Sequence, residues 1–494
     1  MKTKLSNKEI ALSVLTFVIC VIALLAVMLS MLQLNFDGDL FDYVKNEPKY
    51  AVNILTVVIS VCVLGMITYC YFYFENKQFL AKRSKIIELY LMMILAFIGC
   101  FLVGKYVDSA ARPLLFMSLM AAMLFRRRDA MFVNTVFAFT LFIYNRYLNS
   151  TGTLGVLEDG GVTLIESITS LLTLFCGGLI GIILLKSVKT RLGSVNITFV
   201  LLIPTLLINL VLRLPSEEHR TWGLILELLG WSAFDCALSV LLFMAFLPVF
   251  EALFSELTPF RLRELTGENA KLIKRLRTAA PGTYNHSIVV AQLAEACAIA
   301  IGEDSELARA AAYYHDIGKL KNPEMFTENQ SEYDMHKELT PELSVDIIRS
   351  HARDGAQLIK KNHLPEFFAD VAIQHHGTLP IKYFYAKALK MSDGELNAAN
   401  YSYPGPTPTT KIAAIIMIAD ASEAAARSLV ERTPEKVEAL VSSLVEERMN
   451  MDQFVDCDIT MRELTIITRT LVNGLTGVYH SRIKYPKLVL SKKK

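Results

Sequence analysis

The chain has 494 residues, of which 53% are hydrophobic and 20% are charged. This composition is too apolar for an ordinary soluble protein, and the long apolar runs lie in residues 1–250. A formal net charge of +2 excludes strong bulk attraction of a nucleic acid polymer. Eight cysteines without a CxxC pair exclude a disulfide framework and a zinc knuckle.

Eight apolar segments in the N-terminal half predict membrane-spanning helices, since roughly 20 apolar residues cross a hydrocarbon core of about 30 Å. The first is longer than the apolar part of a signal peptide and is followed by no cleavage site, which predicts a retained anchor at residues 1–33. A short external loop at 34–50 and seven further spans in 51–250 follow. The predicted spans are about 10–33, 51–74, 86–104, 113–125, 130–149, 162–185, 196–212 and 222–250.

Lys and Arg in the short loops predict the orientation of these spans, because positive residues favour the cytoplasmic side. With the N-terminus inside, the inner ends carry Lys2, Lys4, Lys8, Lys77, Lys82, Arg83, Lys85, Arg126, Arg127, Arg128, Lys186, Lys189 and Arg191. The outer loops carry only Lys45, Lys49, Lys105, Arg112, Arg213 and Arg220, with Arg146 at a helix end. We therefore expect a multi-pass protein of the plasma membrane whose N-terminus and C-terminal half are cytoplasmic.

Two features near the end of the membrane region each allow two interpretations. Asp235, in the last span, either has a functional role or pairs with a neighbouring helix. Residues 251–277 predict two short amphipathic helices, interrupted by Pro259 and Gly267. These helices either couple a membrane signal to the next domain or lie on the lipid surface.

Eight of the nine histidines lie in the C-terminal half, between helices rich in Ala, Leu and Ile. They occur in TYNHS, YYHDIGK, DMHKE, RSHARDG, KNHLP, IQHHGT and VYHSR, and an acidic residue, Asp420, lies in the apolar run AAIIMIADASEAAAR. This pattern predicts an all-α bundle whose helices donate His and Asp side chains into a common core. Metal sites in helical bundles are commonly built in this way.

Seven residues are candidate metal ligands: His286, His315, Asp316, His351, His375, His376 and Asp420. Imidazole and carboxylate ligands without a thiolate suit iron, manganese or zinc. One tetrahedral zinc needs four ligands, so seven fit two octahedral ions that share a bridging carboxylate. Such a pair clamps a phosphodiester and activates a bridging water. A lone His on an apolar helix is usually a core residue, but burying this many ionisable groups without a shared partner costs several kcal/mol.

The other polar candidates are less specific. Lys319, one turn after Asp316, either contacts phosphate or ends a helix in solvent. Arg427, two turns after Asp420, either reaches substrate phosphate or forms a structural salt bridge. Tyr284 and Thr378 are candidate pocket residues, and the loop at 401–411 is a lid or a connector. His336 and His363 lie outside the tight motifs, and His219 and His480 are expected in solvent.

The motifs APGTYNHS, AYYHDIGK, ENQ, SHARDG, QHHGT, YPGP and IADASEAAARS resemble the membrane-bound seven-transmembrane family of HD-domain phosphohydrolases. The resemblance is close over about residues 255–480 and loose over 51–250. It implies a polytopic transmembrane helix bundle followed by a cytoplasmic, all-helical HD domain at 278–480 and a basic tail at 481–494. It also implies two divalent metal ions, usually iron or manganese, and hydrolysis of cyclic di-AMP to linear pApA.

The resemblance assigns roles to the candidate residues. It implies that one metal is held by His286, His315, Asp316 and Asp420, and the second by Asp316, His351, His375 and His376. Asp316 would bridge the two, and Asp316 and Lys319 are the catalytic candidates. Tyr284, Lys319, Thr378 and Arg427 are the substrate candidates.

The chain also departs from the family. Relatives usually carry a large external domain between the first two spans, where this chain has only residues 34–50. The external sensory input is therefore absent, deleted or supplied by another protein. The expected partners are the lipid bilayer and a homodimer or a separate sensor. Thr407 and Ile412 stand where relatives often have a basic and an acidic residue, which leaves the loop's substrate contacts open.

Two alternative functions stay open on the residues alone. One is hydrolysis of another phosphoester, such as cyclic di-GMP, (p)ppGpp or a deoxynucleotide. His351, His375 and His376 argue against a mononuclear hydrolase, and the GYP signature of cyclic di-GMP enzymes is absent. The other is a membrane receptor that binds a nucleotide without cutting it.

Overall fold

The computed structural model describes residues 6–34, 44–45, 48–147, 160–188, 190–216, 221–330, 333–392, 395–429, 431 and 433–478. Within these ranges the chain is helical and contains no strand, apart from an isolated bridge between Pro380 and Ser402. The all-α prediction is confirmed. The chain divides into two compact units, the N-terminal unit Met1–Phe260 and the C-terminal unit Arg261–Lys494. The predictions for His219, His480, the tail at 481–494 and most of the loop at 34–50 lie outside the described residues.

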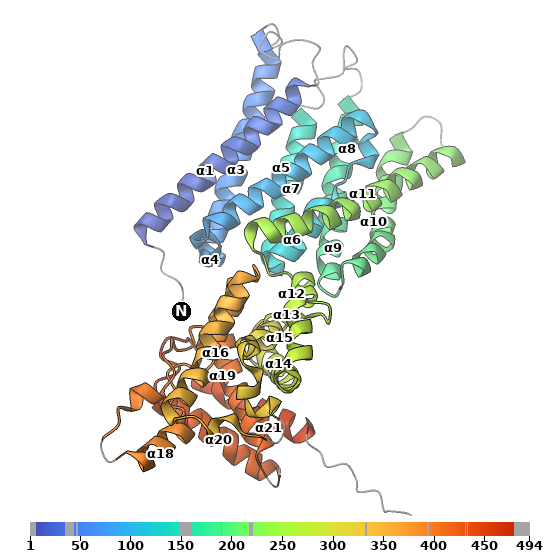
Figure 1. The fold of residues 1–494 in the computed structure, drawn as a ribbon. Helices are drawn as coiled ribbons and strands as arrows, with labels where there is room; N and C mark the ends of the chain where they lie inside the picture. Colours follow the sequence, from blue (N-terminus) through green and yellow to red (C-terminus); the bar gives the residue numbers. More distant parts are fainter. Residues whose placement is uncertain are drawn as a thin grey trace, which may run out of the picture. The chain divides into compact units, whose positions relative to one another are not determined.

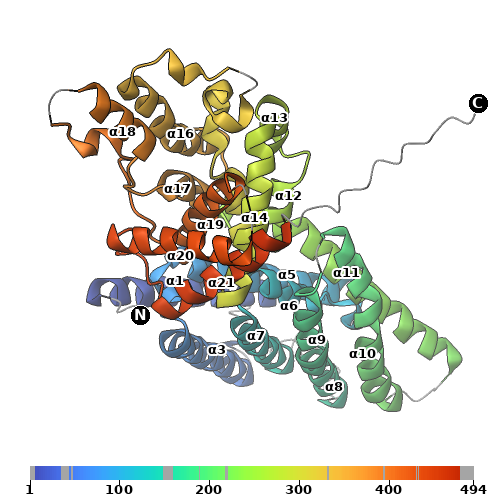
Figure 2. The same cartoon turned by 90° about the horizontal axis from the view of Figure 1, so that it is seen from below.

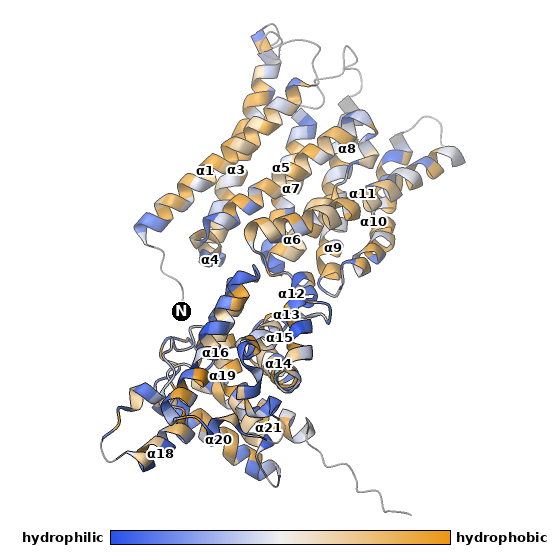
Figure 3. Cartoon of the chain, viewed as in Figure 1, coloured by the Kyte–Doolittle hydropathy of each residue, from blue (hydrophilic) through white to orange (hydrophobic). Residues whose placement is uncertain are grey.

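The N-terminal unit is a bundle of apolar helices (Figures 1 and 3). Its helices are α1 (Asn7–Gln33), α3 (Pro48–Glu75), α4 (Lys77–Ala81), α5 (Arg83–Tyr106), α6 (Leu115–Leu124), α7 (Arg127–Tyr147), α8 (Gly160–Leu172), α9 (Gly178–Leu185), α10 (Val195–Arg213) and α11 (Trp222–Phe254). Six described helices are long and apolar enough to cross a membrane: Asn7–Gln33, Tyr50–Glu75, Arg83–Tyr106, Leu164–Leu185, Leu192–Arg213 and Trp222–Phe254.

Two of the eight predicted spans are not among these six helices. The segment 113–125 forms α6, whose ten residues are all buried and extend only about 15 Å. It packs against α7, α9 and α11 inside the unit. The segment 130–149 forms α7, which is 21 residues long but carries Arg127, Asp129 and Arg146 in its first and last turns.

Polar side chains buried in this bundle are satisfied by specific partners. The Ser118 hydroxyl donates to Asn134 at 2.6 Å, and the Asn134 amide donates to the carbonyl of Leu174 at 2.8 Å. The carbonyl lies in a π-helical turn, Thr173–Gly177, in which backbone bonding is irregular. Asp235 Oδ1 accepts from the Leu114 amide at 3.1 Å and from a serine one turn later at 3.0 Å. These contacts support the structural interpretation of Asp235.

The C-terminal unit begins with the two short helices expected at the junction and continues as a helical domain (Figure 1). Its helices are α12 (Pro259–Thr266), α13 (Lys271–Ala279), α14 (Pro281–Ile301), α15 (Ser305–Tyr314), α16 (Pro341–Lys361), α17 (Glu366–Gln374), α18 (Lys382–Met391), α19 (Lys411–Arg427), α20 (Pro434–Asn450) and α21 (Met461–Val478). The first of them starts just before the division between the two units.

Helix α19 lies at the centre of this unit. Residues 412–420 are all buried, as expected for a helix that is apolar on every side. It contacts α14, α17, α20 and α21. Figure 2 shows α16, α17 and α18 on one side of α19 and α20 and α21 on the other. The acidic residue at the end of the apolar run, Asp420, is therefore carried into the interior between helices that hold the histidines.

Candidate metal centre

The seven predicted ligands come from five helices and meet in one place. His286 lies on α14 and His351 on α16, while Asp420 lies on α19. His315 caps the C-terminal end of α15, and His375 caps that of α17. Asp316 and His376 follow directly in the chain. Six of the seven side chains are buried, and His376 is partly exposed.

A first group contains His286, His315, Asp316 and Asp420, whose nearest ligand atoms all lie within 4.8 Å of one another. His286 Nε2 is 2.9 Å from Asp420 Oδ1 and 3.7 Å from Asp316 Oδ2. His315 Nε2 is 3.4 Å from Asp316 Oδ2 and 3.8 Å from Asp420 Oδ1. Two imidazoles and two carboxylates thus face one small volume.

A second group contains Asp316, His351, His375 and His376, also within 4.8 Å. His351 Nε2 is 3.3 Å and His375 Nε2 is 3.7 Å from Asp316 Oδ1. The first group lies on Oδ2 of the same carboxylate, so the two oxygens of Asp316 face different groups. This is the geometry of a bridging carboxylate.

The hydrogen bonds of three histidine rings turn their Nε2 atoms toward the ligand groups. The Nδ1–H groups of His315, His351 and His375 each donate to the carbonyl three residues earlier, so Nε2 is the ring atom that can bind a metal. The Nε2 atoms of His351 and His375 then lie only 3.3 Å apart. His315 Nε2 and Asp316 Oδ1 are buried without a hydrogen bond. The donor set therefore fits divalent metal ions, since it consists of converging acceptors.

Neighbouring charges and burial favour charged carboxylates and neutral imidazoles for most of the predicted ligands, which are the forms that bind a metal. Burial would raise the pKa of Asp316, but Lys319 and His315 hold it well below its ordinary value. Burial lowers the pKa of His376, and the adjacent His375 adds to this effect. His286 and His315 differ, because their carboxylate neighbours outweigh burial and raise their pKa values, that of His315 to about 10. Metal ions would have to displace these protons.

Sequence reasoning missed Glu423, one turn after Asp420 on α19. Its Oε2 accepts from His286 Nδ1 at 2.5 Å, and its other oxygen accepts from Arg427 at 2.6 Å. A carboxylate behind a ligating histidine fixes the ring and raises its basicity. The only hint in the sequence was that Glu423 follows Asp420 by three residues, which places both on one face of a helix. Arg427 therefore forms a salt bridge with Glu423, which was one of the two interpretations of this residue.

Lys319 is held between two carboxylates, 2.7 Å from Asp316 Oδ2 and 2.8 Å from Glu328 Oε1. Burial would lower the pKa of Lys319, but these neighbours raise it, so the ammonium stays charged. The turn that carries Lys319 contacts α16 closely, and a Cβ at Gly318 would collide with the carbonyl of His351. Glycine is therefore required for Asp316 and His351 to meet.

A cavity of about 850 Å³ opens beside the two ligand groups. His286, His351, His376 and Asp420 form one part of its wall. Lys319, Glu328, Glu423, Arg427 and Arg448 supply charge, and Phe326, Ile348, Tyr383, Phe384 and Tyr403 supply flat or apolar surface. A pocket of this size and character accommodates a ligand of several hundred Å³.

Comparisons with known proteins support the same domain. The family model "HD domain" matches residues 283–425. The cyclic-di-AMP phosphodiesterase PgpH of Listeria monocytogenes is 45% identical over 295 residues, which are 60% of this chain and 40% of that protein. PgpH of Bacillus subtilis is 44% identical over 250 residues, which are 50% and 35% of the two chains.

The solved HD domain of L. monocytogenes PgpH is 48% identical and matches over its full length, with a TM-score of 0.41 and 43% of this chain covered. Residues 283–425 thus match an HD domain, and the chain is similar to PgpH over 250 to 295 residues. This chain also has six described helices that are long and apolar enough to cross a membrane, which indicates a membrane protein. The same domain solved in complex with cyclic-di-AMP is 49% identical, covers 43% of this chain and 99% of that structure, and has a TM-score of 0.42. The chain spans well under half the length of the curated relatives it matches.

Not every predicted substrate residue of the HD domain lies at the cavity. Lys319 and Arg427 line it, whereas Tyr284 and Thr378 do not. Thr378 instead exchanges hydrogen bonds with Gln453 at 2.8 and 2.9 Å. These hydrogen bonds favour a structural role for this threonine.

Two residues of the HD domain line the cavity although the sequence analysis did not predict them there. Tyr403, in the loop at 401–411, is partly buried and stacks on His376 with ring centroids 4.2 Å apart, so the loop contributes to the wall. Burial raises the pKa of Tyr403, which keeps its hydroxyl protonated. His336 also lines the cavity, and its Nε2 bonds the Met325 carbonyl at 2.7 Å; it belongs to neither ligand group.

Proposed function

We propose that the chain is a membrane-bound phosphodiesterase that hydrolyses cyclic di-AMP to linear pApA. The observation that carries the proposal is the position of Asp316 between two ligand groups beside a large cavity. The relatives with 45% and 44% identity are named as cyclic-di-AMP phosphodiesterases, and one solved HD domain was captured with that nucleotide.

Two divalent metal ions, iron or manganese, are the proposed cofactors, because imidazole and carboxylate donors without thiolate suit them. His286, His315, Asp316 and Asp420 would hold one ion, and Asp316, His351, His375 and His376 would hold the other. When bound, such a pair generates a nucleophile from water at neutral pH and neutralises charge on phosphoryl oxygens. No side-chain nucleophile is then required.

The protein's own residues position these ligands and the substrate. Glu423 orients His286 through its Nδ1, so that Nε2 faces the first group. Lys319 fixes the carboxylate of Asp316 and also lies on the cavity wall, where its ammonium is available to a phosphate oxygen. Arg427 neutralises Glu423 and faces the same cavity. These cations complement the two negative phosphates of a cyclic dinucleotide.

The aromatic part of the cavity supports a substrate with flat bases. Phe326, Tyr383, Phe384 and Tyr403 line it together with the metal-side residues. A base stacked on an aromatic side chain gains about 1–3 kcal/mol. Two adenines joined through a small phosphate ring would place their bases on these walls while a phosphate meets Lys319.

The proposed location is the plasma membrane with the N-terminus and the HD domain in the cytoplasm. The excess of Lys and Arg at the inner ends of the spans supports this orientation. Lys82, Lys85 and Arg126 lie at one end of the bundle, at the starts of α5 and α7. Reporter fusions at each terminus would test it: cytoplasmic activity from both is expected, and an external signal from either would overturn it.

The activity is tested with the purified full chain in nanodiscs, loaded with Mn²⁺ or Fe²⁺ and given labelled cyclic di-AMP. Linear pApA is expected as the product, with cyclic di-GMP, (p)ppGpp and deoxynucleotides in a parallel panel turning over more slowly. Metal content is measured on the same sample. Metal-loaded protein that binds cyclic di-AMP but leaves it intact would overturn the proposal and favour a nucleotide receptor.

A further inference from the structure

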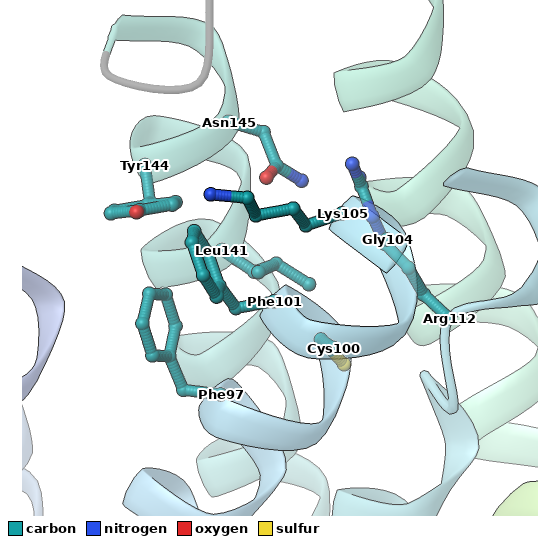
Figure 4. A pocket seen from close by; sticks show the side chains of 9 residues that line it. All are labelled: Phe97, Cys100, Phe101, Gly104, Lys105, Arg112, Leu141, Tyr144 and Asn145. Atoms are coloured by element: carbon teal, nitrogen blue, oxygen red, sulfur yellow. The ribbon is translucent and has the colours of Figure 1, made fainter. Parts of the chain in front are cut away.

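A second set of buried polar atoms without hydrogen-bond partners lies in the N-terminal unit, where α5 and α7 end (Figure 4). Arg112, Tyr144 and Asn145 are only 4%, 1% and 6% exposed. The Nη1 of Arg112, the hydroxyl of Tyr144 and the Nδ2 of Asn145 have no partner in the described part of the chain. Each of these three atoms is a hydrogen-bond donor.

All three side chains line one small cavity of about 10 Å³. That volume holds about one water-sized particle. The rings of Phe97 and Phe101 form apolar parts of its wall. In Figure 4 the Lys105 side chain runs from the end of α5 toward the Tyr144 ring, with the Asn145 amide above it and the Arg112 guanidinium beside Gly104.

Backbone and sequence features bring the guanidinium to this place. A Cβ at Gly104 would collide with Arg112 Nε and lie 3.1 Å from Nη2, so only glycine lets the guanidinium lie against the end of α5. Arg112 lies between a short 3₁₀ turn, Ser109–Ala111, and the start of α6.

The charge around the cavity is positive. Glu166 is 4.0 Å from Arg112 Nη2 and also accepts a hydrogen bond from Ser109 at 2.7 Å. None of the described residues that line the cavity is acidic, and Lys105 adds a second cation there. Nearby Asp235 is occupied by the Leu114 amide. A buried guanidinium in apolar surroundings is costly unless it is paired, so Nη1 favours an anionic partner in the cavity.

We propose that this cavity binds one small monovalent anion of halide size. An anion accepts hydrogen bonds from Arg112, Tyr144 and Asn145 together and neutralises the guanidinium. A water molecule fills the same space but carries no charge, and its oxygen accepts only two hydrogen bonds. The site is separate from the metal centre and does not depend on the proposed phosphodiesterase activity.

The test measures chloride binding to the full chain in nanodiscs, with ³⁶Cl⁻ as the probe and gluconate as the replacing anion. Saturable binding of one chloride per chain is expected. Tyr144→Phe removes one donor without a change in shape and should weaken binding about tenfold, because hydrogen bonds to charged groups are strong. Arg112→Gln should abolish binding.

The matched control is Tyr90→Phe, because Tyr90 is a buried tyrosine of α5 that does not line the cavity. Its variant should bind chloride as the unmodified chain does. Circular dichroism establishes that each variant folds, and Tyr144→Phe decides the outcome if Arg112→Gln does not fold. The proposal is overturned if the unmodified chain shows no saturable binding, or if the two Tyr→Phe variants bind chloride equally.

Discussion

The C-terminal and N-terminal units each contain a cluster of buried polar atoms without hydrogen-bond partners, and the two clusters are of opposite kinds. In the C-terminal unit these atoms are Asp316 Oδ1 and, once its proton is displaced, His315 Nε2, which are acceptors. In the N-terminal unit they come from Arg112, Tyr144 and Asn145, and all are donors. Converging acceptors call for a cation and converging donors for an anion.

The surroundings of each cluster support its interpretation as a binding site for an ion. Elsewhere in the N-terminal unit, the buried side chains of Asn134 and Asp235 have specific protein partners. In the C-terminal unit, Glu423 accepts a hydrogen bond from Nδ1 of His286, on the side of the ring away from the cluster. Unsatisfied atoms that meet in one small volume therefore distinguish a binding site from ordinary buried polarity.

The largest effect is expected from Asp316→Asn, which removes the charge shared by both ligand groups. Turnover of cyclic di-AMP should fall by at least about 10³-fold, because the loss disturbs both metal positions at once. Product chromatography and metal analysis measure the two consequences on one sample. Asp354→Asn is the matched control, since Asp354 pairs with Lys321 at 3.0 Å outside the cluster. Two retained metals with turnover within tenfold of normal would break the assignment.

Glu423→Ala tests the support behind His286. Loss of a carboxylate behind a ligating histidine typically costs 10- to 100-fold in metal affinity or activity. A titration with Mn²⁺ should show this loss, and Glu423→Gln should recover much of it, because its amide oxygen still accepts from His286 Nδ1. Equal Mn²⁺ affinity of Glu423→Ala and the unmodified chain would show that the contact plays no part in the centre.

A smaller effect is expected from Tyr383→Ala on the aromatic wall. Tyr383 is 71% exposed and lines the cavity, so its removal should leave the fold intact while the KM for cyclic di-AMP rises about tenfold. Tyr333→Ala provides the comparison, since Tyr333 is 52% exposed and does not line the cavity. If both variants keep a normal KM, the bases lie elsewhere.

The smallest effect concerns pH and Glu328. Burial would raise the pKa of Glu328, but Lys319 outweighs it and lowers this pKa below the ordinary 4.5. Its pairing therefore stabilises the fold above about pH 4.5, and this stability is lost as the pH falls through the lower folded-state pKa. Hydrogen exchange of α14 and α16 in metal-free protein should show Glu328→Gln less stable at pH 7 by about 1 kcal/mol. The difference should shrink at pH 3; a constant difference would contradict the argument.

The cluster of His and Asp side chains could be predicted from the sequence because these residues stand out in apolar helices. Asp420 follows eight buried residues, and the adjacent His375 and His376 end another apolar run. Glu423 could not be singled out in the same way, because it stands among alanines like a surface acid; only the fold shows it behind His286. Thr378 looked similar to its neighbours in IQHHGT, but the turn after α17 directs it to Gln453.

The donor cluster was beyond sequence reasoning for a different reason. Arg112 was assigned to an outer loop and Asn145 to a predicted span, and neither position indicated contact with the other. Hydropathy also assigned 113–125 as a full span, although α6 is a ten-residue helix covered on all sides. Burial by neighbouring helices and exposure to lipid produce the same apolar composition, so length and packing were needed to separate them.

The contrast between a cation site in the C-terminal unit and an anion site in the N-terminal unit is tested most directly by anomalous diffraction. Crystals of the full chain would be soaked with Mn²⁺ and bromide. We predict two manganese peaks roughly 3.5–4 Å apart on either side of the Asp316 carboxylate, and one bromide peak among Arg112, Tyr144 and Asn145. A single manganese peak away from Asp316, or bromide absent from the cavity at the end of α5, would contradict the account.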